Sequence, residues 1–135
     1  MQLLQDRIRR EGKVLPGNII KVDGFLNHRV DTKLMEAIAD EFAKTFDISD
    51  ITMVLTAEAS GIALAAICAN RYNVPMVFAK KAKSDNIEGG LYQSEIFSYT
   101  YKKKMTLILS KEWLNKDDKV LIIDDFMAKG NAMQG

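Results

Sequence analysis

Two spacings of apolar residues alternate along the chain. Recurrence every three or four residues predicts an amphipathic helix, and a short continuous apolar run predicts a buried strand. The longest helical pattern follows Asp31, a residue type that caps helix amino termini; there Leu34, Ile38 and Phe42 recur every four residues. The patterns predict helices over residues 1–10, 31–46 and 60–72, and strands over residues 51–55, 76–79 and 120–123.

The order of these elements predicts the fold class. The strand at 51–55, the helix at 60–72 and the strand at 76–79 form a βαβ unit, whose two strands lie parallel in one sheet. We therefore expect an α/β fold with a Rossmann-like parallel sheet flanked by helices. With 135 residues, 47% of them hydrophobic, the chain suits a single domain, 1–135, with a real core.

The pattern changes between residues 80 and 110. Strand-like runs at 92–101 and 105–109 flank three consecutive lysines, and Gly89 and Gly90 mark a turn. We predict a β-hairpin over residues 81–110 that leaves the parallel sheet. From these residues alone it is either a solvated hairpin whose lysines protect an edge strand, or a flexible lid over a polyanionic substrate.

Charge and cysteine content exclude some classes of protein. The formal net charge is +1, so no broad field indicates a nucleic-acid or membrane partner. The single Cys68 excludes an intramolecular disulfide and fits a reducing compartment, so we expect a cytoplasmic protein with a buried, inert thiol at this position. His28 is the only histidine, and we predict no metal bound by protein side chains.

The strongest chemical signal lies at residues 120–132. An apolar strand ends at the adjacent carboxylates Asp124 and Asp125, and small residues then alternate with polar ones. A turn of small residues lets successive backbone N–H groups converge on an anion, and a helix starting there adds further donors. This order predicts a ribose-phosphate site, unless the segment is only a polar turn with two solvated aspartates. The phosphate loop would consist of Ala128, Lys129, Gly130, Asn131 and Ala132.

A second candidate phosphate loop follows the strand at 51–55. Ala57, Glu58, Ala59 and Ser60 connect that strand to the next helix, so their backbone donors point outward at the carboxyl edge of the sheet. Taken alone, this segment is better explained as an ordinary turn in which Ser60 caps the helix. Its place on the same sheet edge as the first loop favours the binding of one molecule with two phosphate ends.

The segment at 120–132 resembles the type I phosphoribosyltransferases, in which an apolar strand, two acidic residues and a small-x-Gly-x-small loop follow one another. The resemblance implies that Asp124 and Asp125 lie by the ribose hydroxyls of phosphoribosyl pyrophosphate (PRPP). It also implies that loop 128–132 holds the 5′-phosphate, that loop 57–60 holds the pyrophosphate, and that Mg²⁺ binds through the pyrophosphate. Homodimers are expected from the same resemblance. The lid would close through Ser98, Tyr99 and Thr100.

Residues 17–31 resemble the xanthine-specific members of this family, in which the segment forms part of a hood over the purine. Residues 1–30 are therefore expected to be a hood that contacts the base through Ile20 and Asn27, although Asn27 alone could equally cap a turn. Ala128 stands where hypoxanthine-guanine enzymes carry an aspartate, which weakly favours xanthine. The implied reaction transfers 5-phosphoribosyl from PRPP to N9 of xanthine in purine salvage, giving XMP and pyrophosphate.

Three alternatives stay open at this point. Members of the family continue well beyond the phosphate loop. Residues 31–135 are therefore expected to be an incomplete PRPP-binding core. The chain would then be either an inactive fragment or part of a longer protein. A regulatory domain of a purine repressor would bind PRPP without using it, but residues 1–12 are too short to add a DNA-reading module. An adenine or hypoxanthine-guanine transferase is the third alternative.

Overall fold

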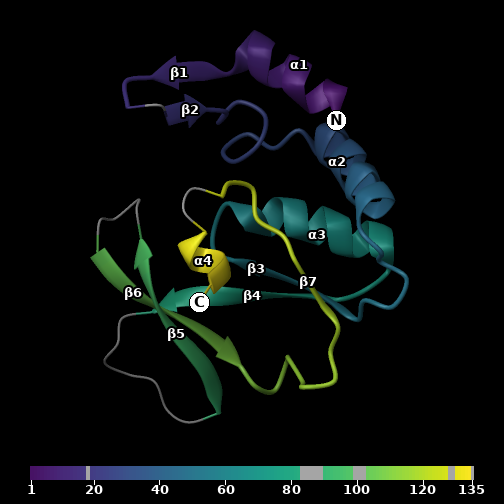
Figure 1. Cartoon of the computed structure of the whole chain (residues 1–135), viewed down its shortest axis with the longest axis vertical. Coiled ribbons are helices and arrows are strands. Elements are labelled where there is room, and N and C mark those ends of the chain that lie inside the picture. The colour runs from purple at the N-terminus through teal and green to yellow at the C-terminus, as the bar shows by residue number, and fades with distance from the viewer. Residues whose placement is uncertain (18, 83–89, 99–102, 128–129, 135) are drawn as a thin grey trace.

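The computed structural model describes residues 1–17, 19–82, 90–98, 103–127 and 130–134 (Figure 1). Within these ranges, every helix is too short or too polar to cross a lipid bilayer. The helices are α1 (Gln2–Glu11), α2 (Thr32–Thr45), α3 (Gly61–Tyr72) and α4 (Asn131–Gln134). The strands are β1 (Lys13–Leu15), β2 (Ile19–Lys21), β3 (Met53–Ala57), β4 (Met76–Ala82), β5 (Leu91–Ser98), β6 (Lys103–Ser110) and β7 (Val120–Ile122).

The main sheet has five strands in the order β5-β6-β4-β3-β7. Strands β4, β3 and β7 are parallel, as the βαβ pattern predicts, and this confirms the α/β fold class. The predicted hairpin is β5 and β6, but it does not leave the sheet. Strand β6 pairs antiparallel with the end of β4, so the sheet is mixed rather than wholly parallel. Whether the hairpin moves as a lid stays a prediction.

One face of the parallel strands forms the core. Val54, Met76 and Leu121 lie on this face because paired residues of neighbouring strands point to the same side. Helix α3 covers it, and α2 packs against α3. The buried core consists of Val22, Phe25, Leu26, Leu34, Met35, Ile38, Ala39, Val54, Leu64, Ala65, Cys68, Ala69 and Ile123.

The predicted buried position of the one cysteine is confirmed. Cys68 lies in α3 with none of its surface exposed. Burial raises the pKa of its thiol, because the thiolate would lose its hydration. The reactive form is therefore disfavoured, as expected of a structural cysteine.

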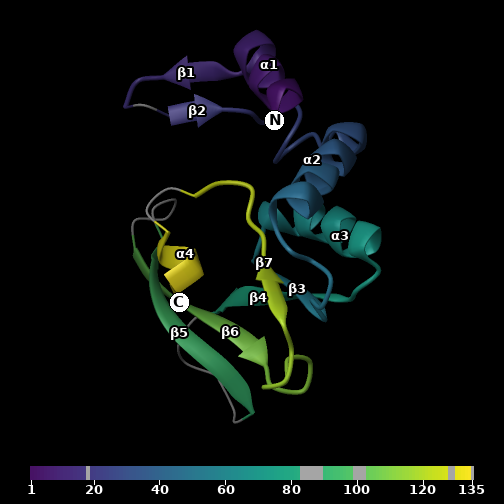
Figure 2. The same ribbon diagram turned by 45° about the vertical axis from the view of Figure 1, so that its right-hand side comes forward.

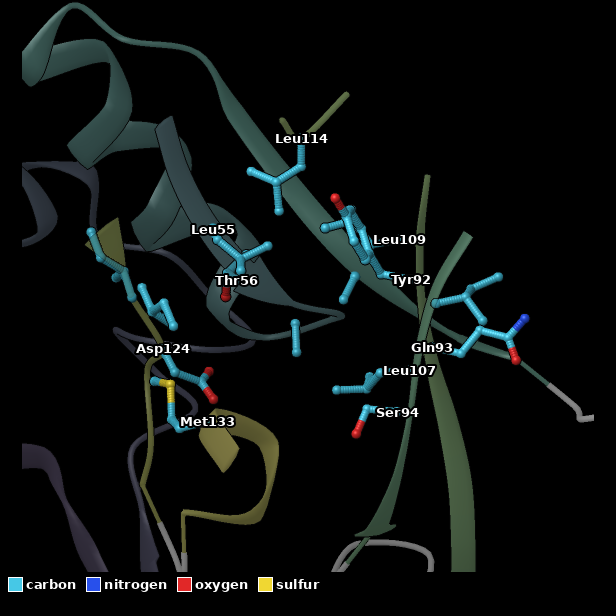
Figure 3. Close-up of a pocket in the computed structure, with 15 residues that line it drawn as sticks. Leu55, Thr56, Tyr92, Gln93, Ser94, Leu107, Leu109, Leu114, Asp124 and Met133 are labelled. Atoms are coloured by element: carbon cyan, nitrogen blue, oxygen red, sulfur yellow. The ribbon is translucent and has the colours of Figure 1, made fainter. Parts of the chain in front are cut away.

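The opposite face of the sheet is apolar and, among the described residues, partly exposed. Leu55 and Ile122 are paired on it, and Ile122, in the edge strand β7, remains 46% exposed. This face and the β5–β6 hairpin enclose a cavity of about 380 Å³, into which Met133 of the short helix α4 projects (Figure 3). The cavity reaches Asp124, at the carboxyl end of β7.

The amino-terminal segment contains a two-stranded ribbon that the sequence did not reveal. The segment around Pro16 and Gly17 reads as irregular, whereas β1 and β2 pair antiparallel there, with Val14 opposite Ile20. Three-residue strands are too short to show a period, which is why the prediction missed them. The ribbon lies on the side of the molecule toward which β7 points (Figures 1 and 2).

Candidate active site

The predicted loop at 57–60 and the acidic pair lie together at one edge of the sheet. Their strands, β3 and β7, are parallel neighbours in which Leu55 pairs with Ile122, so residues 57–60 and the acidic pair emerge side by side. The Ser60 hydroxyl donates a hydrogen bond to Asp125 Oδ1 at 2.9 Å. Two segments 65 residues apart in sequence are thus joined by a direct contact.

Ser60 does not cap α3 through its side chain. It occupies the N-cap position, but its side chain forms no capping hydrogen bond. Its backbone is already helical, with φ −68° and ψ −31°, whereas a side-chain cap usually needs an extended residue. The hydroxyl is instead directed to the neighbouring loop at Asp125.

Asp124 is the carboxylate most affected by its surroundings. Burial first, and the neighbouring Asp125 carboxyl group next, raise the pKa of Asp124 to about 6, although the Asp125 backbone N–H and the charge of Lys81 act in the opposite direction. The Asp125 N–H donates to Asp124 Oδ1 at 2.9 Å. Adjacent carboxylates in a partly buried site repel each other, and an enzyme tolerates such repulsion where a bound cation or hydroxyl relieves it.

Thr56 and Gly61 flank the predicted loop at 57–60, and the structure adds both to this site. A Cβ on Gly61 would lie 2.7 Å from Asp124 Oδ1 and closer still to Thr56 Oγ1. Thr56 is 2% exposed, and its hydroxyl has no hydrogen-bond partner in the part of the chain that the structure describes. Glycine at the first position of α3 therefore lets the helix start against both side chains. The role of Gly61 could have been recognised from the sequence, because a small residue there opens a helix shortly after a strand.

The loop at 57–60 is held against β4. The Glu58 N–H donates to Ala79 O at 2.9 Å, and the Glu58 carboxylate accepts a hydrogen bond from the backbone N–H of Lys81. The peptide bond between Glu58 and Ala59 is cis. The Glu58 side chain is thus engaged with the sheet, so any anion bound by this loop would meet backbone N–H groups. Lys81 is a further residue that sequence reasoning missed.

The remaining predicted residues of the phosphate loop and the lid are only partly described. Gly130 has φ +75°, a conformation that favours glycine, and its carbonyl accepts from the N–H groups of Met133 and Gln134. Ala128 and Lys129, like Tyr99 and Thr100 of the predicted lid, lie outside the described residues. Three further predicted residues are described in their backbone only: Ser98, Asn131 and Ala132.

The predicted base-recognition residues are exposed. Ile20 is 43% exposed on β2, and Asn27 is exposed in the turn between β2 and α2. The turn's own N–H groups, those of His28 and Arg29, bond to Asp23 O. The Asn27 side chain forms no hydrogen bond to any described residue, so no turn cap by Asn27 is seen there.

Comparison with known proteins decides the family. The sequence model of the phosphoribosyl transferase domain matches residues 26–135. The chain belongs to the phosphoribosyl transferase family. The family predicted from residues 120–132 is thereby confirmed, and the match includes both loops of the site.

Curated relatives agree over the whole chain. A xanthine phosphoribosyltransferase of Lachnoclostridium phytofermentans is 53% identical over 135 residues, and one of Clostridium novyi is 49% identical. The alignments cover all of this chain and 70% and 71% of those two proteins. This phosphoribosyl transferase chain thus spans about 70% of the length of these relatives.

Solved structures share the fold. An adenine phosphoribosyltransferase from Giardia lamblia, complexed with 9-deazaadenine, superimposes with a TM-score of 0.76 at 24% identity over 96% of this chain and 71% of that one. One from Rhodothermus marinus gives 0.72 at 17% identity, with 98% and 75% covered. At such low identity these likenesses concern the phosphoribosyl transferase fold alone.

Proposed function

We propose that this phosphoribosyl transferase moves 5-phosphoribosyl from PRPP to N9 of xanthine, giving XMP and pyrophosphate in purine salvage. The observation that carries the proposal is the contact between Ser60 and Asp125, because it brings one candidate phosphate loop against the acidic pair that precedes the other in sequence. PRPP has that form, with a 5′-phosphate, two ribose hydroxyls and a pyrophosphate. The choice of xanthine rests on the relatives, which carry that name at 46–53% identity.

The proposed chemistry needs positioning and charge rather than a covalent nucleophile. The bond between C1 and the pyrophosphate oxygen breaks with its electron pair leaving on that oxygen, N9 bonds to C1, and the N9 proton passes to solvent. The ribose ring gains positive charge as the bond breaks. Asp124 and Asp125 would hold the ribose hydroxyls and favour that charge electrostatically. Loops 57–60 and 128–132 would hold the two phosphate ends and so align the reacting carbon.

The residues of the site fit a magnesium ion carried by the substrate. Mg²⁺ in such sites binds mainly substrate phosphate oxygens and water, with one or two carboxylates. No group of three metal-ligating side chains exists among the described residues, but Asp125 Oδ2 is buried without a hydrogen-bond partner in the same part of the chain. Asp125 would therefore face the ion, whose positive charge neutralises the leaving pyrophosphate.

The base would bind beneath the amino-terminal hood. Ile20 offers an apolar side chain to cover a purine ring, and the Asn27 amide can both donate to and accept from the ring edge. Both are exposed and free to meet a ligand. Lid closure through Ser98, Tyr99 and Thr100, a homodimer and a cytoplasmic location remain parts of the proposal.

A base panel tests the proposed reaction. The protein, supplied with PRPP and Mg²⁺, is expected to convert xanthine to XMP with a kcat/KM roughly tenfold or more above those for guanine, hypoxanthine and adenine. Nucleotide formation is followed by chromatography. PRPP binding without pyrophosphate release for any purine would point instead to the regulatory domain of a repressor. Preference for adenine would point to the enzymes with which the fold is shared.

The pKa of Asp124 predicts the acidic limit of activity. A carboxyl group whose pKa is about 6 is protonated below that pH and ionised above it. Only the ionised form can accept hydrogen bonds from both ribose hydroxyls and balance the ring charge. We therefore expect kcat/KM for PRPP to fall about tenfold per pH unit below pH 6, as measured by initial rates across a buffer series. A profile flat down to pH 4.5 would contradict this role.

A further inference from the structure

The first helix packs against the core through the partly buried side chains of Leu4 and Ile8. None of the residues of α1 is buried, and Leu3 is 52% exposed. The helix nevertheless stands beside the turn that carries Asn27. One side chain, that of Arg7, reaches across this junction and is only 24% exposed.

Arg7 contacts both ends of that turn. Its Nη2 lies 3.0 Å from Asp31 Oδ2, and its guanidinium carbon lies 5.5 Å from the centroid of the Phe25 ring, a cation–π distance. Its Nε also lies 2.8 Å from Glu11 Oε1, although the N–H is not aimed at that oxygen, since Nε forms no directed hydrogen bond. The planar, always charged guanidinium is suited to stacking and pairing at once.

Asp31 connects Arg7 to α2. Its Oδ1 accepts from the Leu34 N–H at 3.1 Å and so caps the helix, while its other oxygen pairs with Arg7. The pKa of Asp31 is lowered by the Leu34 N–H first and by the Arg7 charge as well. Asp31 N also donates to Phe25 O at 3.0 Å, which closes the turn.

Two further side chains between these anchors also attach the segment to the core: Leu26 is 7% exposed, and Val30 packs against the core from a partly buried position. Phe25 is 1% exposed and sits in the core, whereas Asn27, His28 and Arg29 are exposed. The orientation of Asn27 is therefore set by Leu26 and Val30 together with the two ends of the turn, which Phe25 and Asp31 hold. Arg7 touches both of these residues.

We propose that Arg7 is a positioning residue for base recognition, which acts by holding the 25–31 turn through Phe25 and Asp31. The inference rests on the proposed role of Asn27 and goes beyond it, because α1 then contributes to base binding without touching the base. The PRPP-binding rim around Asp124 is formed by other elements. Its use of PRPP should not depend on Arg7.

The test compares Arg7→Met with Arg9→Met in the intact gene product. Methionine keeps most of the aliphatic stem and removes the charge. Arg9 is the matched control, because it lies on the same helix and, among the described residues, pairs with Asp6 alone, at 3.4 Å on the exposed face. Arg7→Met is expected to raise KM for xanthine about 3- to 10-fold, with kcat and the KM for PRPP within about twofold of wild type. Arg9→Met should leave all three constants unchanged.

Two further variants keep the test decisive. Asp31→Asn preserves an oxygen acceptor for Leu34 N–H while removing the charge that pairs with Arg7, so it should reproduce the rise in KM for xanthine. Its effect should not add to that of Arg7→Met in the double variant. Arg7→Lys keeps the charge but not the planar fork, and should recover part of the lost affinity.

Hydrogen exchange measures the local stability of the 25–31 turn independently of enzyme activity. Amide exchange at Phe25, Leu26 and Asp31 should be faster in Arg7→Met and unchanged in Arg9→Met. A wild-type protein that makes no XMP would refute the proposed function rather than the role of Arg7. A protein that makes XMP with the same KM for xanthine in both arginine variants would overturn the proposal. An equal rise in the KM for xanthine and the KM for PRPP in Arg7→Met would overturn it as well.

Discussion

Replacing Asp124 with asparagine is expected to lower PRPP turnover by about a hundredfold or more while making the folded protein more stable at neutral pH. Turnover falls because a neutral amide cannot balance the positive charge of the reacting ribose. Stability rises because a buried carboxylate next to Asp125 is removed, and its strain is visible in a pKa raised to about 6. Asparagine keeps an oxygen that can accept from the Asp125 N–H.

The pH dependence of this gain follows from the direction of the pKa shift. A carboxyl group with a raised folded-state pKa gives stability that is fully present below its unfolded pKa of 3.8 and is lost as the pH rises through about 6. The advantage of Asp124→Asn should therefore be present at pH 7.5 and absent near pH 4. Thermal unfolding at both pH values measures it, with Asp117→Asn in an exposed loop as the control. Normal turnover in Asp124→Asn would remove the ribose assignment.

Gly61→Ala is expected to reduce both stability and turnover. The added Cβ would lie 2.7 Å from Asp124 Oδ1 and closer to the Thr56 hydroxyl, so the start of α3 or the acidic pair must shift. Overpacking of this kind costs about 1–3 kcal/mol of unfolding free energy. A displaced Asp124 should also lower turnover roughly 10- to 100-fold, since small misplacements at a reacting centre are costly.

The matched control for this change is Gly24→Ala. Nothing lies within 4 Å of the Cβ that it would add, and the backbone there needs no left-handed conformation. Denaturant unfolding and initial rates are measured for both variants. If Gly61→Ala unfolds and reacts like Gly24→Ala, then the close approach of α3 to the acidic pair affects neither stability nor turnover.

The long elements could be predicted from local pattern alone. Helix α2 begins after Asp31, as its capping residue indicates, and β7 starts at Val120 where the apolar run begins. Strand β3 runs two residues later than the apolar run suggests, to Ala57. Strand ends depend on the neighbour that supplies hydrogen bonds, and the pairing of Ala57 with Ala79 is a contact that no local pattern contains.

The candidate site divides in the same way. Asp124, Asp125 and the small residues after them could be predicted as a site because the features of a phosphate loop lie in consecutive residues. No role was predicted for Gly61 or Lys81, because each acts on Asp124, which is distant from both in sequence. Sequence reasoning also gave Ser60 two possible roles, as a cap or as part of an anion loop.

By itself, the sequence determined the fold class, the family and the order of strand, acids and loop, since these depend on periodicity and on neighbouring residues. Only the tertiary structure decided that Ser60 bonds to Asp125, that Gly61 presses against Asp124, and that Arg7 joins α1 to the turn at Asp31. The physical reason is that burial and contact between distant segments set hydrogen-bond partners and pKa values. Neither exists until the parallel strands place their carboxyl ends side by side.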